Sequence, residues 1–237
     1  MDDSSLTPMI KQYLAIKEKY SDSILFYRIG DFYEMFFEDA VQASKLLDIT
    51  LTSRNKNDPN PIPLCGVPHH SVEPYIAKLL QKGKKVAVCD QVEDPKIAKG
   101  VVRREVTRVI TPGIILDSAS VKGDEHNYIA AIAPNDSTEG AFGLAIADVS
   151  TGHFSALQFN SMDALSEEVF RLEPKEIILP ISLSEKTTFN NKIKKSNFNP
   201  VFTVLNNNFF EPQAISGLDG ARTLIKQYPM AAKAAAA

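Results

Sequence analysis

Residues 27–36 read YRIGDFYEMF, and this stretch decides how the first part of the chain is expected to fold. Apolar residues of the strand-forming type run up to Gly30-Asp31, a pair that predicts a turn. Residues 32–37 then continue as a short extended segment. The stretch therefore predicts a strand, a turn and a second extended segment.

Side chains alternate along an extended segment, so Phe32, Glu34 and Phe36 are expected on one face and Tyr33 and Met35 on the other. By strand rise, the first two of these lie about 7 Å apart. Periodicity alone favours Phe32 as a core residue and Glu34 as a residue at the rim of the core. A charge between two phenylalanines is unusual for a core, however, because it would have to be buried and paired.

An exposed Phe beside a Glu has a physical use on duplex DNA. The ring can wedge between base steps from the minor groove and kink the duplex. A neighbouring carboxylate can accept a hydrogen bond from a displaced base edge, or donate one if it is held protonated. The same carboxylate is repelled by the phosphates of a well-paired duplex, which favours weakly stacked or mispaired steps.

Sequence periodicity predicts a mixed α and β unit around this stretch. The expected helices are 8–20, 38–47 and one that opens at residues 71–74 and stops at Gly83. The expected strands are 24–29, 49–53, 86–92 and 101–110, and the polar, proline-broken segment 54–63 is expected to be a loop.

The second half of the chain predicts a different sheet. Three closely spaced strands, 128–133, 141–149 and 152–158, are followed by a helix at 162–172 and by strands at 176–179 and 201–205. Three antiparallel strands followed by alternating helix and strand favour a ribonuclease H-like sheet. The predicted fold class is therefore α/β (α+β): a mixed-sheet N-terminal domain with surrounding helices, then a ribonuclease H-like α/β domain.

Composition shifts give the expected domain boundaries. Residues 1–116 form the first domain, the small polar segment 117–127 a linker, and residues 128–230 the second domain. The tail 231–237, AAKAAAA, is interpreted as an artificial appendage or as unassigned residues written as alanine, and it is left out of functional reasoning.

Bulk composition excludes several classes of protein. The chain of 237 residues is 44% apolar and 23% charged, as in soluble globular proteins, and it has no apolar run near the ~18 residues of a membrane span. The acidic, polar N-terminus does not resemble a secretory signal. Two cysteines, Cys65 and Cys89, provide neither a disulfide framework nor zinc spacing, so a reducing cytoplasm is expected.

Charge is spread unevenly along the chain. Residues 1–116 carry 16 basic against 15 acidic side chains, whereas residues 117–237 carry 10 against 14. The run KIAKGVVRREVTR, residues 96–108, sets five basic side chains against one acid. This run is compatible with phosphate contacts, although such runs are more often solvated faces.

Several catalytic signatures are absent from the sequence. It contains no phosphate-binding loop of the G-x-x-x-x-G-K-[ST] type, no G-x-S-x-G and no H-E-x-x-H. His69-His70 is expected to be structural, because a metal site needs further ligands at defined spacing. A metal-dependent nuclease would need converging carboxylates, but strand 128–133 has none, Asp148 stands alone, and the acids of residues 31–39 are weak candidates.

The motif YRIGDFYEMF closely resembles the mismatch-recognition motif of the MutS family of DNA mismatch repair proteins. The similarity continues through TPMIKQY (7–13), ASKLLDITLTSR (43–54), PIPLCGVPHHSVEPY (61–75), AVCDQVEDP (87–95) and REVTRVITPG (104–113). The segment GLAIADVSTGHF (143–154) is similar to the connector domain of the family, which is ribonuclease H-like.

The resemblance implies roles for individual residues. Phe32 would stack on the mispaired base, Glu34 would hydrogen-bond that base, and Ile29 would pack beside the wedge. Arg54 and Arg104 match positions that contact the DNA backbone. Nearby candidates for backbone contacts are Tyr75, Lys78 and His70, and charge alone adds Arg103, Arg108, Lys96 and Lys99.

The resemblance covers only the first two domains of the family. The lever, clamp and ATPase domains are missing, so this chain is expected to be non-enzymatic and to need no cofactor, whereas ATP and Mg would act in a full-length protein that is a DNA-dependent ATPase. The implied partners are duplex DNA with mismatches or small loops and other mismatch-repair factors that dock on the connector. The implied location is a bacterial cytoplasm, on the nucleoid and not at a membrane. An alternative stays open: a protein-interaction module of the repair machinery with little DNA binding of its own.

Overall fold

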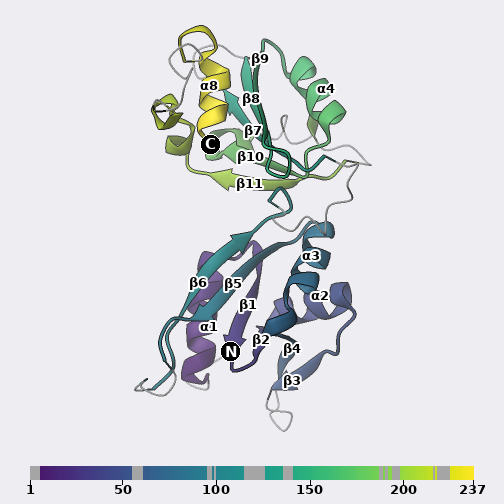
Figure 1. The fold of residues 1–237 in the computed structure, drawn as a ribbon, viewed down its shortest axis with the longest axis vertical. Coiled ribbons are helices and arrows are strands. Elements are labelled where there is room, and N and C mark those ends of the chain that lie inside the picture. Colours follow the sequence, from purple (N-terminus) through teal and green to yellow (C-terminus); the bar gives the residue numbers. More distant parts are fainter. Residues whose placement is uncertain are drawn as a thin grey trace. The chain divides into compact units, whose positions relative to one another are not determined.

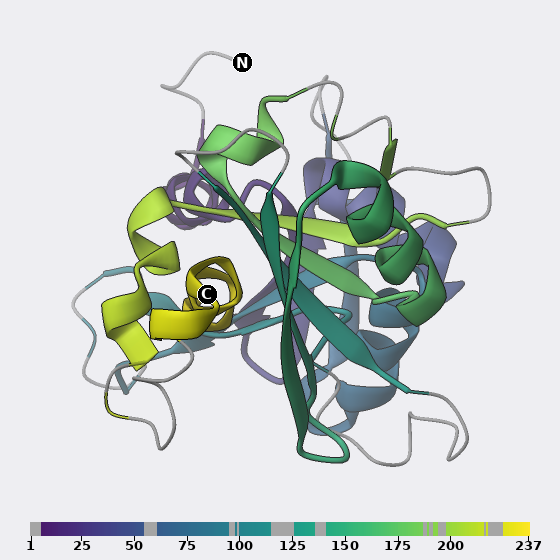
Figure 2. The ribbon, with the colours of Figure 1, turned by 90° about the horizontal axis from the view of Figure 1, so that it is seen from above.

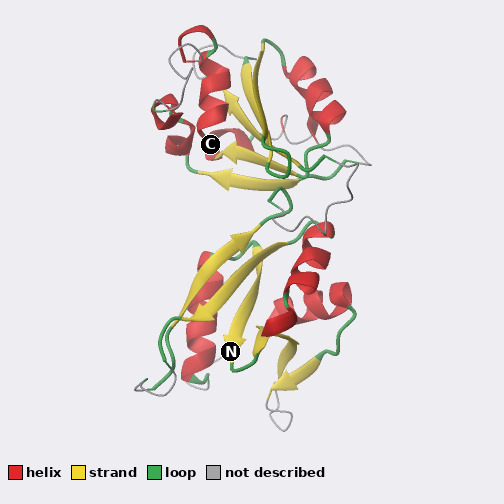
Figure 3. Cartoon of the chain, viewed as in Figure 1, coloured by secondary structure: helices red, strands yellow, loops and turns green. Residues whose placement is uncertain are grey.

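The computed structural model divides into two compact units, Met1–Thr111 and Pro112–Ala237, each built on one β-sheet with helices against it (Figures 1 and 3). It describes residues 6–54, 61–94, 98, 100–114, 126–135, 141–186, 189, 192–193, 198–215, 217 and 225–237. Of the predicted linker, residues 117–125 lie outside this described part. No helix within it is both long enough and apolar enough to cross a bilayer.

Unit 1 contains a six-stranded mixed sheet in the order β3-β4-β2-β1-β5-β6 (Figure 1). Its strands are β1 (Ser23–Ile29), β2 (Phe32–Phe36), β3 (Thr52–Arg54), β4 (Ile62–Pro68), β5 (Lys85–Gln91) and β6 (Arg104–Ile110). Strand β1 pairs with β2 in antiparallel and with β5 in parallel orientation, and the remaining pairs are antiparallel. The first unit is therefore the mixed α and β domain that the sequence predicts.

Helix α1 (Pro8–Lys19) covers one face of this sheet. Its N-cap is Thr7, whose side chain accepts from the backbone N–H of Ile10, and a proline occupies the first helical position. Ile10 and Tyr13 of the helix are buried in a core cluster with residues of β1, β2, β4 and β5, namely Leu25, Tyr27, Phe36, Ile62, Ala87 and Cys89.

Helices α2 (Phe37–Leu47) and α3 (Glu73–Gln81) also pack against this sheet, and α2 contacts β1, β2 and β4. The Sγ atom of Cys65 on β4 donates to the carbonyl of Ala40 in α2, so α2 lies over the face that Cys65 and its cross-strand partner Met35 share. Helix α3 contacts β5 and α2. Cys65 and Cys89 are both buried free thiols.

Strand β2 alternates as its sequence predicts. Tyr33 and Met35 are buried on the α2 face, whereas Phe32 is 48% exposed on the other. Phe36 shares the face of Phe32 but is fully buried beneath α1. The interpretation of Phe32 as a core residue is therefore wrong: α1 covers only the Phe36 end of this face and leaves the Phe32 end open.

The structure corrects the prediction between residues 49 and 68. The predicted strand 49–53 is displaced to Thr52–Arg54, and the end of the predicted loop 54–63 already belongs to β4. Pro63, Gly66 and Pro68 lower the strand propensity of β4, but pairing with β2 and β3 on its two sides overrides that preference. Residues 55–60 lie outside the described part. The predicted strand 101–110 is likewise shorter, since β6 starts at Arg104.

Unit 2 contains a five-stranded sheet in the order β11-β10-β7-β8-β9. The strands are β7 (Tyr128–Pro134), β8 (Phe142–Asp148), β9 (His153–Phe159), β10 (Glu176–Pro180) and β11 (Val201–Leu205). The first three are antiparallel, and β10 and β11 add in parallel beside β7. The predicted order of three antiparallel strands followed by alternating helix and strand is therefore confirmed.

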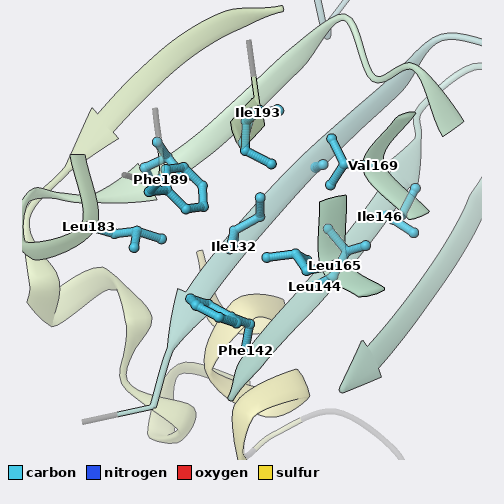
Figure 4. Packing of buried hydrophobic residues seen from close by; sticks show 12 residues of the cluster. Ile132, Phe142, Leu144, Ile146, Leu165, Val169, Leu183, Phe189 and Ile193 are labelled. Atoms are coloured by element: carbon cyan, nitrogen blue, oxygen red, sulfur yellow. The ribbon is translucent and has the colours of Figure 1, made fainter. Parts of the chain in front are cut away.

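Helix α4 (Met162–Leu172) and the C-terminal helix α8 (Pro229–Ala236) pack on opposite faces of this sheet (Figure 2). Helix α4 (Met162–Leu172) inserts Leu165 and Val169 into the main core, shown in Figure 4 with Ile132, Leu144, Ile146 and the other members of the cluster. The short helix α5 (Ile181–Ser184) adds Leu183 to the same core.

The C-terminal residues form helix α8 (Pro229–Ala236) on the other face, next to the 3-10 turns η3 (Asn207–Phe210) and η4 (Pro212–Ile215). A Cβ atom built on Gly143 of β8 would lie 1.7 Å from the carbonyl oxygen of Met230. The helix backbone therefore approaches the sheet as closely as only a glycine allows. The alanine-rich segment thus occupies a defined place in the fold.

Leu165 gives a direct test of the unit 2 core. Replacing this fully buried side chain by Ala is expected to lower the free energy of unfolding of unit 2 by about 2–5 kcal/mol, because it leaves a cavity. Leu157→Ala on β9, where the side chain is 38% exposed, is the matched control and should cost less than about 1 kcal/mol. Urea unfolding of both variants measures the difference, and equal losses would contradict the assignment of Leu165 to the core.

Candidate nucleic-acid interface

Phe32 stands in a cross-strand row at the open end of the sheet. Its Cα partners are Ile29 on β1 and Pro68 on β4. Residues directly opposite each other in a sheet share a face, so Ile29 and Pro68 flank the ring on its two sides. The packing of Ile29 beside Phe32 therefore follows from the strand register.

The turn that presents Phe32 is held from both sides. Gly30 has a φ of +54°, which the turn requires. The Nε of Arg28 donates to the Gly30 carbonyl, and the backbone N–H of His69 donates to the Asp31 carbonyl at 2.9 Å. Sequence reasoning assigned His69 only a structural role and gave Arg28 none. The role of His69 in holding the turn follows from its position directly after Pro68, the residue opposite Phe32.

Glu34 occupies the next row, between Tyr27 on β1 and Gly66 on β4. A Cβ atom on Gly66 would meet Cγ of Glu34 at 3.5 Å, so the glycine leaves the space on that flank empty. Arg54 NH1 lies 3.8 Å from Glu34 Oε2, which is an ion pair but not a hydrogen bond. Among the described residues, this buried oxygen has no hydrogen-bond partner.

The ionisation of Glu34 reflects two opposing effects. Burial raises the pKa of the carboxyl above its ordinary value, and the guanidinium charges of Arg54 and Arg104 act in the opposite direction. Desolvation is the larger effect, so the carboxyl takes up a proton more readily than a solvated Glu. Such a group is available both as an acceptor and, once protonated, as a donor.

Arg104 lies beneath this row and is buried. Its Nε donates to the Arg28 carbonyl at 2.6 Å, its NH1 donates to the Val102 carbonyl at 2.8 Å, and its guanidinium sits 4.8 Å from the centre of the Tyr27 ring. A hydrogen bond to Gln12, which also accepts from the Tyr27 hydroxyl, completes the set. The guanidinium is thus committed to internal partners, and its predicted contact with a DNA backbone stays a prediction.

The remaining residues predicted to contact the DNA backbone lie on several elements of unit 1. Lys78 Nζ donates to the Leu47 carbonyl at 3.0 Å, where it closes the C-terminal end of α2. Arg108 pairs with Glu73 of α3 at 3.2 Å. Tyr75 is half-buried on α3. His70 is exposed beside the ring of His69. Arg103 is exposed, and its Nε lies 3.4 Å from Glu105 Oε1. Lys96 and Lys99 lie outside the described residues.

The acidic groups considered as metal ligands have other partners. Asp39 accepts from the Tyr13 hydroxyl, the Leu25 amide and Lys17 at 2.9–3.1 Å. Asp148 in unit 2 accepts from Ser150. Within the described part of the chain, no cluster of three or more His, Cys, Asp or Glu side chains could hold a metal ion.

Comparison with known proteins matches both units. The family model described as MutS domain I matches residues 7–119, and MutS domain II matches residues 127–227. The chain is 52% identical to "DNA mismatch repair protein MutS" of Desulfatibacillum aliphaticivorans over 78% of its length, and 56% identical to that of Syntrophobacter fumaroxidans over 74%. The MutS of Desulforapulum autotrophicum is 46% identical over 93% of the chain. The chain spans 20% to 24% of the length of these relatives.

Arg54 tests the electrostatics around Glu34. Replacing Arg54 by Gln is expected to raise the pKa of Glu34 further, because the larger of the two opposing charges is removed while burial stays. A carboxyl with a raised pKa destabilises the fold as the pH rises through that pKa, so the variant should lose more stability at neutral than at acidic pH. NMR titration of the Glu34 carboxyl measures the shift, with Arg103→Gln as control. An unchanged pKa would contradict the pairing.

Proposed function

Because the chain belongs to the MutS family of DNA mismatch repair proteins, we propose that its N-terminal unit binds mispaired or unpaired bases in duplex DNA through Phe32 and Glu34. The observation that carries the proposal is the pairing of these two side chains on the open end of one sheet face. One is an aromatic ring 48% exposed, and the other is a carboxylate with a buried oxygen that lacks a hydrogen-bond partner among the described residues.

Phe32 is suited to act as a wedge. Its ring projects from a strand end next to a turn whose carbonyls are tied down by Arg28 and His69. Inserting a ring between base steps costs a few kcal/mol of unstacking per step. A turn that is firmly held does not yield when the ring is pushed against the bases, so it favours insertion. Stacking on a base returns about 1–3 kcal/mol. Mispaired steps cost less to open, which gives the ring a preference for them.

Glu34 is suited to contact the displaced base. Gly66 leaves room on one flank of the carboxylate, and Phe32 lies on the same face. An unsatisfied buried oxygen carries an energetic cost that a hydrogen bond from a base edge would relieve. Its raised pKa makes the carboxyl easier to protonate than a solvated Glu, and the protonated form can donate to a base acceptor. Against a matched duplex, the ionised carboxylate repels the phosphates.

Contacts with the DNA backbone supply the affinity that does not depend on sequence. Arg54, whose side chain is 39% exposed, and the more exposed Arg103 are the cations best placed to reach phosphates. The buried Arg104 packs against the Tyr27 ring, and its charge acts on Glu34. Each phosphate contact releases counterions, so binding is expected to weaken steeply with salt.

The proposal for the whole protein reaches beyond this chain. The 237 residues contain no phosphate-binding loop that could bind ATP, and they span about a fifth to a quarter of the relatives' length. We therefore propose that any step that depends on ATP and Mg, including a DNA-dependent ATPase activity of the full-length protein, takes place outside these residues. Unit 2, the MutS domain II match, would dock other repair factors.

Phe32→Ala tests the proposed function. The variant is expected to lose the preference for a G·T duplex over a matched one, because the stacking contact of about 1–3 kcal/mol disappears. Phe154→Ala in β9 is the matched control, since that ring is 56% exposed in unit 2. Fluorescence titration of both duplexes with each variant, at fixed low salt, measures the ratio.

Three measurements separate the alternatives. A Phe32→Ala variant that still prefers the G·T duplex would show the wedge assignment to be wrong. If titration with DNA shifts only NMR signals beyond residue 117 and none of residues 29–34, the chain is an interaction module instead. Cleavage of a labelled duplex in magnesium or manganese would favour a nuclease.

Arg103→Gln tests the phosphate contacts. The variant is expected to bind matched and mismatched duplexes more weakly by the same factor, and its slope of log affinity against log salt should fall by about 1. Arg171→Gln in unit 2 is a matched control, because both arginine side chains are 66% exposed and paired with a carboxylate. A change in the mismatch preference itself would contradict a role limited to phosphates.

A further inference from the structure

The face of β2 opposite Phe32 and Glu34 carries a side-chain bridge across the sheet. The Tyr33 hydroxyl donates to Asp90 Oδ1 on β5 at 2.6 Å, and the Thr107 hydroxyl on β6 donates to Asp90 Oδ2 at 2.6 Å. The strand order is β2-β1-β5-β6, so the bond from Tyr33 to Asp90 passes over β1 and joins β2 to β5, which share no backbone hydrogen bonds, whereas the bond from Thr107 to Asp90 joins the paired strands β6 and β5. Asp90 is its centre, with one oxygen for each neighbour.

The bridge depends on an irregularity in the sheet. The pairing of β5 with β6 shifts register between Val88 and Cys89, and Thr107 is the extra residue of β6 at that point. Such a bulge re-aims a side chain, and here the hydroxyl of the bulged residue points to Asp90. The bulge and the bridge are therefore one local arrangement.

Strand β2 is held at this end by its backbone ladders with β1, which has three register pairs, and with β4, which has five, and Phe32 stands at the terminal pair of each. The Tyr33 side chain adds a tie to the more distant strand β5. The Tyr33 ring is buried against Phe26 at 6.1 Å between centroids, and the Arg28 guanidinium lies 5.6 Å from its centre. Burial, together with the hydrogen bond to Asp90, raises the pKa of Tyr33 to about 12, so its hydroxyl remains a donor throughout the neutral range.

We propose that Asp90 is a positioning residue for mismatch binding, which acts through Tyr33 to fix the direction in which β2 presents Phe32 and Glu34. Successive side chains of a strand leave one backbone on opposite faces, so a twist of the β2 backbone that moves Tyr33 also moves Phe32 and Glu34. The bridge resists that rotation when a base pushes on the ring. This proposal rests on the proposed function of the Phe32–Glu34 pair.

Tyr33→Phe in the 237-residue chain tests the proposal, because it removes the hydroxyl and keeps the ring. Hydrogen exchange of the amides of residues 32–34 should become several-fold faster, since the tie to β5 is lost. The ratio of G·T to matched-duplex affinity should fall about fivefold, the effect of one hydrogen bond, while affinity for the matched duplex stays unchanged.

Tyr13→Phe is the matched control. That tyrosine lies on α1 and also donates to an aspartate, Asp39, at 3.1 Å within the same unit, and its hydroxyl meets β2 at the backbone of Phe36, the opposite end of the strand from Phe32. It is expected to lower stability and to leave the affinity ratio intact. A graded series of Asp90 variants adds rescue: Asp90→Ala should behave like Tyr33→Phe, whereas Asp90→Asn keeps an oxygen for Tyr33 and should retain most of the ratio.

Two results would overturn the proposal. The first is a Tyr33→Phe variant with unchanged exchange and an unchanged affinity ratio, and the second is a Tyr13→Phe variant whose ratio falls as far. Failure of the proposed function looks different, because the unsubstituted chain would then show no preference for the G·T duplex. In that case, unchanged exchange in Tyr33→Phe would overturn the positioning role, and faster exchange would support the bridge alone.

Discussion

Side-chain alternation along β2 is the constraint on which the rest of unit 1 depends. Its five residues place Tyr33 and Met35 on the face that α2 covers at Met35, and send Phe32, Glu34 and Phe36 to the other face. Helix α1 covers that second face only at its Phe36 end. One strand thus contributes to two cores and still keeps one end of one face open, and this open end is the candidate interface.

The chemistry of the open end comes from partial burial. Full solvation would give Glu34 an ordinary pKa, and full burial would require a hydrogen-bonded partner. The carboxylate instead lies between Tyr27 and the empty flank of Gly66, with Arg54 at ion-pair distance and Arg104 below. Desolvation outweighs the attraction of the two cations, so the group can exchange a proton where a solvated Glu remains ionised.

Unit 2 uses small residues for a different purpose. The core beneath α4 is filled by branched and aromatic side chains, whereas α8 meets the opposite face of the sheet through alanines and through Gly143. Small side chains allow the helix backbone to approach the strands closely, and this close approach leaves few voids between helix and sheet. The two faces of one sheet therefore bury their apolar surface by different means.

Local periodicity and motifs predicted most of the element order of both units, the turn at Gly30-Asp31, the alternation of β2 and the family that carries the Phe-Tyr-Glu motif. These features depend on local periodicity and on a motif of neighbouring residues. Strand β4 escaped prediction because its prolines and Gly66 suppress the local signal, and only pairing with β2 and β3 makes it a strand. Tertiary structure alone decided that Phe32 is exposed, that Arg104, Lys78 and Arg108 have internal partners, and that Tyr33 reaches Asp90. The physical reason is that each of these contacts joins residues that are distant in the chain, whose distances are set by strand order and helix coverage and not by local propensity.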